Sequence, residues 1–307
     1  MDAKRPALLL CAALGLSACA DIAGLGDFVD TSSGAGGMGV AGSGGVGDEG
    51  GGGGSGGAGG SGGVGGGTPG AYREAVLFDQ PRAYWPFDDD VLPTLKNVAP
   101  PGLGAEADLD TGGSDAALWP GLIGDYALDL TTFGAVAVSN FGVLGFPMKS
   151  PFSLELWVDV LDTAGLQVVV ERFGQPPPNQ VGYRLIIDSG ELQFHRYLAS
   201  SADTARVPAT PGRSYWVATY DGLCMCLYSI SLAGPEPMPD SMCKTSNKAL
   251  TDADFTFRLG HAAGSHYGGR MDEVAVYPRA LDASEVLAHY AASGKGVVSD
   301  FPMTTCP

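Results

Sequence analysis

The stretch between Gly268 and Leu281 constrains the fold of this chain more than any other part of the sequence. From Met271 to Tyr277, every other position is a potential core residue, which is the period-two pattern of a half-buried strand. The pattern changes after Pro278, where Asp282 is followed three residues later by a glutamate, the spacing of a capping box. The sequence therefore predicts a strand that stops at a proline and then a helix that continues to about Ala292.

The alternation also assigns the side chains of this strand to faces. We expect Val274 and Val276 to face the core, because β-branched residues pack well on the inner face of a sheet. Met271 and Tyr277 are then expected on the opposite face, where the terminal helix covers Tyr277. In that helix, His289 is expected at the surface.

The strand, turn and helix resemble the closing segment of LamG-like jelly-roll domains, which belong to the concanavalin A-like lectin/glucanase superfamily. The matching positions are Gly269, Met271-Asp272-Glu273-Val274, Val276-Tyr277, Arg279 and Leu281. Earlier runs similar to strands of the same family are, in chain order, Arg82–Asp88, Phe152–Val158 and Tyr215–Gly222. The resemblance covers roughly residues 76–292. It implies an all-β fold, an antiparallel two-sheet jelly-roll sandwich with a short C-terminal helix.

The rest of this region consists of short apolar or alternating runs separated by Gly, Pro, Asn and Asp, a pattern that itself favours a sandwich or barrel. Further strands are predicted at Tyr126–Leu130, Ala135–Ser139, Leu166–Phe173, Gly182–Ile187, Glu191–Tyr197, Cys224–Leu232 and Phe255–Gly260. We assign residues 71–292 to one LamG-like jelly-roll domain, since about 220 residues is an ordinary length for a single β-sandwich. Residues 293–307 form a C-terminal tail.

Residues 1–18 have the pattern of a bacterial lipoprotein signal peptide. Two basic residues precede the apolar run Ala7–Leu16, which is too short for a bilayer span of about 20 residues. The end of this segment, Leu16-Ser17-Ala18-Cys19, resembles a lipobox, which implies cleavage before Cys19 and acylation of that residue. The alternative is an ordinary signal peptide with an incidental cysteine. By analogy with enteric bacteria, Ala20 after the cysteine favours the outer membrane, with the periplasmic or surface side left open.

The predicted mature N-terminus, residues 19–33, leads into a glycine-rich tether at residues 34–70. Glycine fills 23 of these 37 positions. Such a segment cannot bury enough apolar surface to offset the entropy lost on ordering, so we expect it to be disordered. As a flexible coil, it would span about 30–35 Å between an anchored Cys19 and the domain.

Four cysteines remain after the predicted processing: Cys224, Cys226, Cys243 and Cys306. An even number in an exported chain suggests two disulfides. Cys224 and Cys226 lie two apart on a predicted strand and share a face, so they cannot easily bond each other. We expect one of them to pair with Cys243 and the other with Cys306, and the connectivity stays open. A zinc site is the weaker alternative, because Cys-x-Cys lacks the usual ligand spacing and no histidine lies near it in sequence.

No arrangement of residues in the predicted domain indicates catalysis. Retaining glycosidases need two carboxyl groups about 5–5.5 Å apart, and the glucanase branch of the superfamily supplies them as Glu-x-Asp-x-x-Glu on one strand. That run is absent here, and Asp272 and Glu273 are strand neighbours that we expect to point to opposite faces. The domain also lacks a Gly-x-Ser-x-Gly elbow and a His-Glu-x-x-His motif. We expect a protein that is not an enzyme, with a divergent glycoside hydrolase as the less favoured alternative.

Two kinds of ligand site are candidates. The resemblance suggests a structural Ca²⁺ shared by Asp88, after the opening strand, and Asp272, on the last strand, since this hard cation takes several oxygen ligands. The alternative is an acidic turn plus a strand-end aspartate that accepts backbone hydrogen bonds. The aromatic candidates for stacking on sugar rings are Trp157, Tyr183, Tyr197 and Tyr267. Most aromatic residues of the domain are nevertheless expected in its core.

Charge narrows the choice of partner. Removing the signal peptide takes away one acidic and two basic residues, so the net charge goes from −17 to −18. This acidity argues against nucleic-acid binding, which needs basic patches. We expect a lipid-anchored cell-envelope protein, in contact with the membrane through its lipid only, that displays a carbohydrate-binding module. The alternative is a protein-interaction or structural envelope domain without a small ligand, whose partner is an envelope or extracellular protein.

Overall fold

The computed structural model describes residues 69–88, 92–101, 108–111, 115–132, 134–138, 144–174, 180–199, 201–250, 255–262, 265–302 and 306. Cys19, the signal peptide and residues 34–68 of the predicted tether lie outside the described residues, so the predictions for them stay predictions. No helix in the described part of the chain is long and apolar enough to cross a membrane.

Two helices, α1 (Pro69–Phe78) and α2 (Ala283–Ala292), flank a series of eighteen strands within the described ranges. The strands are β1 (Ala83–Trp85), β2 (Thr94–Leu95), β3 (Leu109–Asp110), β4 (Ala117–Pro120), β5 (Tyr126–Asp129), β6 (Val136–Val138), β7 (Phe152–Val160), β8 (Leu166–Gly174), β9 (Val181–Asp188), β10 (Glu191–Leu198), β11 (Ser201–Pro208), β12 (Gly212–Tyr220), β13 (Cys224–Ser231), β14 (Met238–Thr245), β15 (Phe257–Leu259), β16 (His261–Ala262), β17 (Ser265–His266) and β18 (Gly269–Tyr277).

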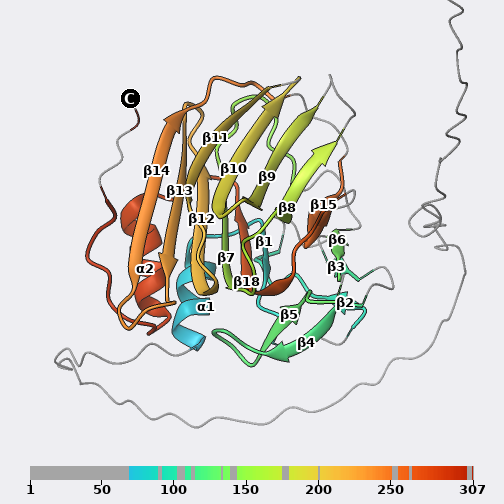
Figure 1. The fold of residues 1–307 in the computed structure, drawn as a ribbon, viewed down its shortest axis with the longest axis vertical. Coiled ribbons are helices and arrows are strands. Elements are labelled where there is room, and N and C mark those ends of the chain that lie inside the picture. Colours follow the sequence, from blue (N-terminus) through green and yellow to red (C-terminus); the bar gives the residue numbers. More distant parts are fainter. Residues whose placement is uncertain are drawn as a thin grey trace, which may run out of the picture. The chain divides into compact units, whose positions relative to one another are not determined.

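The strands form two eight-stranded antiparallel sheets and one small hairpin (Figure 1). Sheet A has the order β14-β13-β12-β7-β18-β5-β4, with β1 also paired to β18. Sheet B has the order β11-β10-β9-β8-β15-β6-β3-β2, and β16 pairs with β17. The predicted two-sheet antiparallel sandwich with a short C-terminal helix is therefore confirmed.

Two apolar cores arrange the domain in three layers. The larger core lies between the sheets and includes Trp85, Phe152 and Phe194. The second lies between the outer face of sheet A and the two helices, and includes Tyr72 of α1 and Tyr290 of α2. Burying a large apolar side chain stabilises a fold by about 1.5–3 kcal/mol, so both helices belong to the domain rather than to its flanking segments.

A β-bulge in β18 changes one of the predicted faces. The register against β7 shifts beside Glu273, whose backbone is left-handed with a φ of 53°. The extra residue places Met271 in the core between the sheets together with Val274 and Val276. The predictions for the two valines are confirmed, while that for Met271 is wrong, because strict alternation does not continue through a bulge. Tyr277 lies beneath the helices, as predicted.

The helix that follows β18 begins at the predicted cap. The side chain of Asp282 accepts hydrogen bonds from the backbone N–H groups of Ser284 and Glu285, and the Glu285 carboxylate accepts from the Asp282 N–H. This reciprocal capping box satisfies donors that the first turn of a helix leaves unpaired. The prediction of His289 at the surface is wrong, since its side chain is buried beneath α2.

The sequence did not predict α1, the long strands β11 and β14, or the short strands β2, β3, β4, β16 and β17. Helix α1 begins at Pro69, inside the last two positions of the range expected to be tether, and proline at the first helical position is favourable because its missing N–H would be unpaired there. Strand β14 is polar and contains Pro239, which an edge strand tolerates because every second N–H of such a strand faces outward and needs no ladder partner.

Two disulfides join the four cysteines, as predicted. Cys226 and Cys243 lie opposite each other on β13 and β14, and Cys224 pairs with Cys306 of the tail. The tail also packs Phe301 against Tyr228, so it is held to the outer face of sheet A.

Candidate functional site

Three of the four aromatic candidates are buried. Trp157 lies in the core beneath the helices, and Tyr183 and Tyr267 lie between the sheets, each at most 1% exposed. A sugar ring cannot stack on a side chain that has no exposed face, so these three residues do not form a binding surface. Tyr197 alone is half-buried, and it lies on the outer face of sheet B.

Polar side chains continue from Tyr197 across the outer face of sheet B. The row consists of Arg184, Tyr197, His195, Gln193, Glu191 and Arg206. Each member bonds the next, at 2.8 Å for the first three bonds, then 3.0 Å and 3.2 Å. We call these six residues the outer row. They come from the three neighbouring strands β9, β10 and β11, which bring positions 22 residues apart into one line.

From Arg184 to Glu191 the hydrogen bonds of the outer row all run in one direction, and Arg206 donates to Glu191 from the other end. The carboxylate of Glu191 only accepts, so the amide nitrogen of Gln193 faces it and the amide oxygen faces His195. That oxygen accepts from Nε2–H of His195, which leaves Nδ1 to accept from the Tyr197 hydroxyl. The Tyr197 oxygen in turn accepts from Arg184. Each partner in the row therefore fixes the orientation of its neighbour.

His195 is neutral in this row. Burial, and then the positive charges of Arg184 and Arg206, lower the pKa of His195 to about 4, against the opposing effect of Asp188. A neutral imidazole donates one hydrogen bond and accepts one, as the direction of the row requires.

Aromatic rings flank the first residue of the outer row. The Arg184 guanidinium lies 4.7 Å from the ring centroid of Phe173 and 4.9 Å from that of Tyr197. Contacts of this kind stabilise by about 0.5–1 kcal/mol at exposed sites. The accessible surface thus combines the partly exposed rings of Phe173 and Tyr197 with the charged groups of Arg184, Glu191 and Arg206. His195 and Gln193 in the middle of the row are buried, each 8% exposed, and orient these neighbours. Neither helix of the described chain packs on this face, since both cover sheet A.

The two residues predicted to bind calcium, Asp88 and Asp272, accept hydrogen bonds from backbone N–H groups. Oδ1 of Asp88 accepts from the N–H of Asp125 at 2.6 Å, and Oδ2 of Asp272 accepts from Leu122 and Ile123 at 2.8 and 2.9 Å. The described residues contain no group of three or more His, Cys, Asp or Glu side chains that could hold a metal. Because Ca²⁺ takes six to eight oxygen ligands, these residues alone do not fit a calcium site.

The bulge brings Asp272 and Glu273 to the same side of β18, contrary to the prediction of opposite faces. Asp272 lies opposite Trp157, and Glu273 accepts from the Tyr84 hydroxyl, and both aromatic residues belong to the core beneath the helices. Burial raises the pKa of Asp272 to about 7, and burial and the Asp272 charge raise that of Glu273 well above its usual value. Oδ1 of Asp272 and Oε1 of Glu273 are buried without a partner. A protonated carboxyl explains this pair without a cation, since it removes the charge that burial disfavours.

A second polar cluster lies buried under the helices. Glu155 of β7 accepts from the hydroxyls of Tyr72, Tyr215 and Tyr277 at 2.5–2.7 Å and contacts Nδ1 of His289 at 2.9 Å. Nε2 of His289 lies 3.0 Å from a carboxylate oxygen of Asp79. We call His289, Glu155 and Asp79 the buried triad. It ties α2, the middle of sheet A and the residue after α1 into one network.

Opposite charges hold the buried triad together. Burial alone would lower the pKa of His289, but the charges and hydrogen bonds of Glu155 and Asp79 outweigh it and raise that pKa to about 9. Burial alone would raise the pKa of Glu155, but His289 and the tyrosine hydroxyls outweigh it and lower that pKa. At neutral pH, a cationic imidazole therefore lies between two carboxylates.

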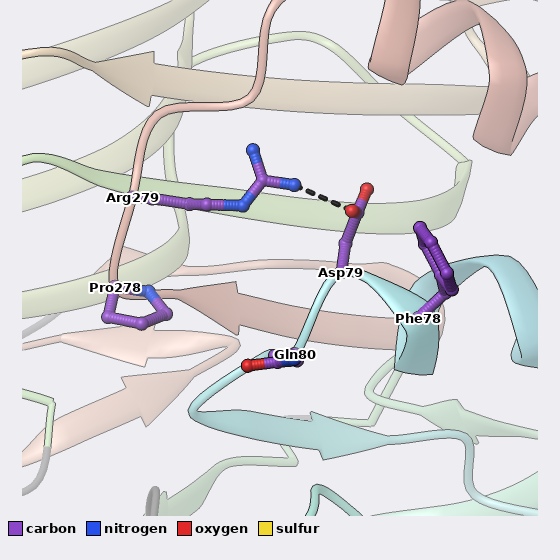
Figure 2. Close-up of a pocket in the computed structure, with 5 residues that line it drawn as sticks. All are labelled: Phe78, Asp79, Gln80, Pro278 and Arg279. Carbon is purple, nitrogen blue, oxygen red and sulfur yellow. Dashed lines mark ion pairs between the residues drawn. The ribbon is translucent and has the colours of Figure 1, made fainter.

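Asp79 continues from the buried triad to a surface pocket of about 280 Å³. The pocket is lined by Phe78, Asp79, Gln80, Pro278 and Arg279. Figure 2 shows Asp79 and Arg279 pointing toward each other, and the two groups are 2.7 Å apart. Phe78 is 83% exposed at the end of α1.

The sequence contained a partial signal for these clusters. Gln193, His195 and Tyr197 recur at every second position of β10, which places them on one face of a strand. Glu155 gave no such signal, because Ser153 and Glu155 alternate with apolar residues in β7 as in a half-exposed strand. The partners of Glu155 could not be found in this way, because Tyr72 and His289 are far away in the sequence.

No family model matches the sequence, and no curated protein matches it. Solved structures, in contrast, match this chain in fold. Domain 4 of AbnA, a GH43 extracellular arabinanase from Geobacillus stearothermophilus, in complex with arabinotriose, is 20% identical with a TM-score of 0.50, and the match covers 69% of this chain and 98% of that one. The binding domain of botulinum neurotoxin DC in complex with SialylT is 12% identical with a TM-score of 0.50, covering 71% and 52%.

The botulinum neurotoxin serotype D binding domain is 11% identical with a TM-score of 0.47, covering 72% of this chain and 52% of that one. The chain thus spans about half the length of the neurotoxin domains it matches. At these identities the matches show the fold alone, a β-sandwich also found in binding domains.

Proposed function

We propose that this chain is a binding module for carbohydrate and that the outer face of sheet B is its binding surface. The observation that carries the proposal is the outer row, in which oriented polar groups lie beside the rings of Phe173 and Tyr197 on the face that neither helix covers. Sugars present apolar ring faces and hydroxyls that both donate and accept. A surface of this composition meets both requirements.

The hydrogen bonds within the outer row favour binding. Side chains already held by their neighbours lose little conformational entropy when a ligand arrives, and reduced ordering cost increases affinity. Tyr197 is held by Arg184 and His195, and its ring is half-buried, so one face of the ring is supported while part of it stays accessible.

Similarity gives the proposal secondary support. The sequence resemblance of residues 76–292 favours a LamG-like member of the concanavalin A-like superfamily, in which sugar binding is expected. Two solved sandwiches of the same fold are described in complex with arabinotriose and with SialylT. We extend carbohydrate binding from them to this chain, without specifying the sugar.

We further propose that the domain binds without catalysis. The carboxyl groups of Glu155, Glu171, Asp272 and Glu273 are each at most 2% exposed. A glycosidase needs two carboxyl groups that reach the scissile bond, one on each side of it. A structural role in hydrogen bonding explains the burial of these carboxyl groups better than a catalytic role does.

The proposed place of action is the cell envelope, on the outer membrane. Support comes from the N-terminal segment, which has an apolar run followed by a lipobox-like Cys19, and from the two disulfides, which persist in oxidising compartments. The glycine-rich residues 34–68 would let the domain reach a glycan at a distance from the anchor.

The test is binding of the full chain to an array of neutral and acidic glycans, followed by calorimetry with the best ligand. Tyr197→Ala should weaken binding at least about tenfold, equivalent to 1.4 kcal/mol. Tyr126→Ala removes another partly exposed tyrosine, on sheet A, and should leave binding unchanged. If wild type binds no glycan, the proposal fails.

One observation favours the alternative of a protein partner. Strand β4 lies at the end of sheet A, and Ala117, Trp119 and Pro120 on it are exposed. An exposed sheet edge is a template for an added strand from another chain. Loss of partner capture on a Trp119→Lys change, with no glycan bound, would support this alternative over carbohydrate.

A further inference from the structure

The pocket at the end of α1 contains charged groups that are already paired. The two carboxylate oxygens of Asp79 contact Arg279 at 2.7 Å and His289 at 3.0 Å. The guanidinium of Arg279 also contacts the carboxylate of Glu285 at 2.9 Å and the carbonyl of Ala280 at 3.3 Å. A charged ligand would have to break these contacts, so the pocket favours a neutral one.

The remaining groups of the pocket suit a ring with an apolar face. Phe78 is the most exposed of the large hydrophobic side chains in the described chain, at 83%. In Figure 2, Phe78 and Pro278 lie on opposite sides of the pocket with Gln80 between them. The Gln80 amide supplies two donors and one acceptor in neutral form. An aromatic wall beside an amide offers stacking and hydrogen bonding together.

The pocket is shaped before any ligand arrives. Gln80 has a left-handed backbone with a φ of 53°, at the position after a helix where glycine or asparagine is usual. Retention of a long side chain in a strained conformation is characteristic of functional sites. Its neighbour Asp79 is fixed by the buried triad, so the pocket wall is anchored to the core of the domain.

We propose that this pocket binds one neutral sugar ring, which stacks on Phe78 and exchanges hydrogen bonds with the Gln80 amide. The volume of about 280 Å³ lies just below the range of about 300–1,000 Å³ for ligand pockets, which limits the ligand to a single ring or the end of a glycan. This inference rests on the proposed carbohydrate function and adds a site on the opposite layer of the domain, away from the outer row.

The experiment is saturation-transfer NMR on the full chain with glucose, galactose, arabinose and N-acetylglucosamine as separate probes. At least one sugar should receive saturation, and Phe78→Ala should weaken its binding about tenfold or more. Gln80→Ala should weaken binding as well, whereas Gln80→Asn keeps an amide and tolerates the left-handed backbone, so it should retain most of the binding. Leu223→Ala removes another exposed apolar side chain and should change nothing.

The outcomes separate the two sites. Binding that survives Phe78→Ala and Gln80→Ala but is lost in Tyr197→Ala overturns the pocket and leaves the proposed function intact. Saturation of the neutral peptide N-acetyl-trialanine amide, and of none of the sugars, overturns the assignment to sugar. If wild type binds neither these sugars nor an arrayed glycan, both proposals are wrong. Unchanged circular dichroism and melting temperature of the variants show that each is folded.

Discussion

Nδ1 of His289 lies 2.9 Å from Oε2 of Glu155, although the two residues are 134 positions apart in the chain. The contact joins the last helix to a central strand of sheet A, and Asp79 on the other side of the imidazole extends it to the end of α1. A buried charge with partners on both sides is costly to disturb, because removing one partner leaves the others unpaired in the interior.

His289→Gln should destabilise the domain by about 3–5 kcal/mol at pH 7, the usual cost of breaking a buried ion pair. Urea denaturation of wild type and variant, followed by tryptophan fluorescence, measures it. His195→Gln is the matched control, since His195 is neutral and lies on the outer face of sheet B. A loss below about 1 kcal/mol in His289→Gln would contradict a charged imidazole in the triad.

The buried triad also predicts a pH window. The pKa of His289 is raised to about 9, so its contribution is complete below its unfolded pKa of about 6.5 and is lost as the pH rises through 9. The pKa of Glu155 is lowered, so its contribution is present above an unfolded pKa of about 4.3 and is lost as the pH falls through the folded value. Melting temperatures should fall on both sides of this window, and the alkaline fall should disappear in His289→Gln.

Val276→Ala should cost about 1–3 kcal/mol, because it removes two buried methyl groups from the core between the sheets and leaves a cavity. Chemical denaturation measures the cost. Val297→Ala provides the control, since Val297 is 78% exposed in the tail. Equal stability of the two variants would contradict the assignment of Val276 to the core.

The cysteines should resist alkylation in native protein until a reductant is added, as mass spectrometry of the intact domain can show. Cys226→Ser or Cys306→Ser should cost about 2–3.5 kcal/mol, the lower half of the range for disulfides of small secreted domains, because this domain also has two apolar cores. Four free thiols in the oxidised protein would rule out both bonds.

Local signals explain what the sequence could predict. Alternation and a capping box act between near neighbours, so β18 and the start of α2 could be read directly from residues 271–285. The bulge at Glu273 depends on pairing with β7, which lies more than a hundred residues away, and alternation alone carries no sign of it. The buried triad could not be predicted from the sequence for the same reason. A histidine on a short amphipathic helix becomes a core residue only once α1 covers it.

Cys19→Ala should abolish lipidation and release a soluble or uncleaved form from the envelope. Metabolic labelling with a radiolabelled or alkyne fatty acid, followed by membrane fractionation, tests this directly. Label that persists in the mutant would contradict the anchor at this residue. Cys11→Ala is the control, because this cysteine lies within the segment expected to be removed.

Asp272→Asn should remove a loss of stability that wild type suffers between about pH 4 and pH 7. The folded pKa of Asp272 is raised to about 7, so its contribution is complete below the unfolded value of about 3.9 and is lost as the pH rises through 7. In the variant, the amide oxygen can accept from Leu122 and Ile123, and the neutral NH₂ takes the place of the unpartnered Oδ1.

Thermal melts across this pH range measure the difference, which has an upper limit of about 1.4 kcal/mol per pH unit for one carboxyl. Repeating them at pH 7 with excess CaCl₂ and with chelator also tests the calcium candidates. Equal melting temperatures are expected, because Asp88 and Asp272 already accept backbone hydrogen bonds. A rise with calcium in wild type that is absent in Asp272→Asn would instead show that residues outside the described ones complete a cation site with Asp272. The explanation of the buried pair by a protonated carboxyl would then be wrong.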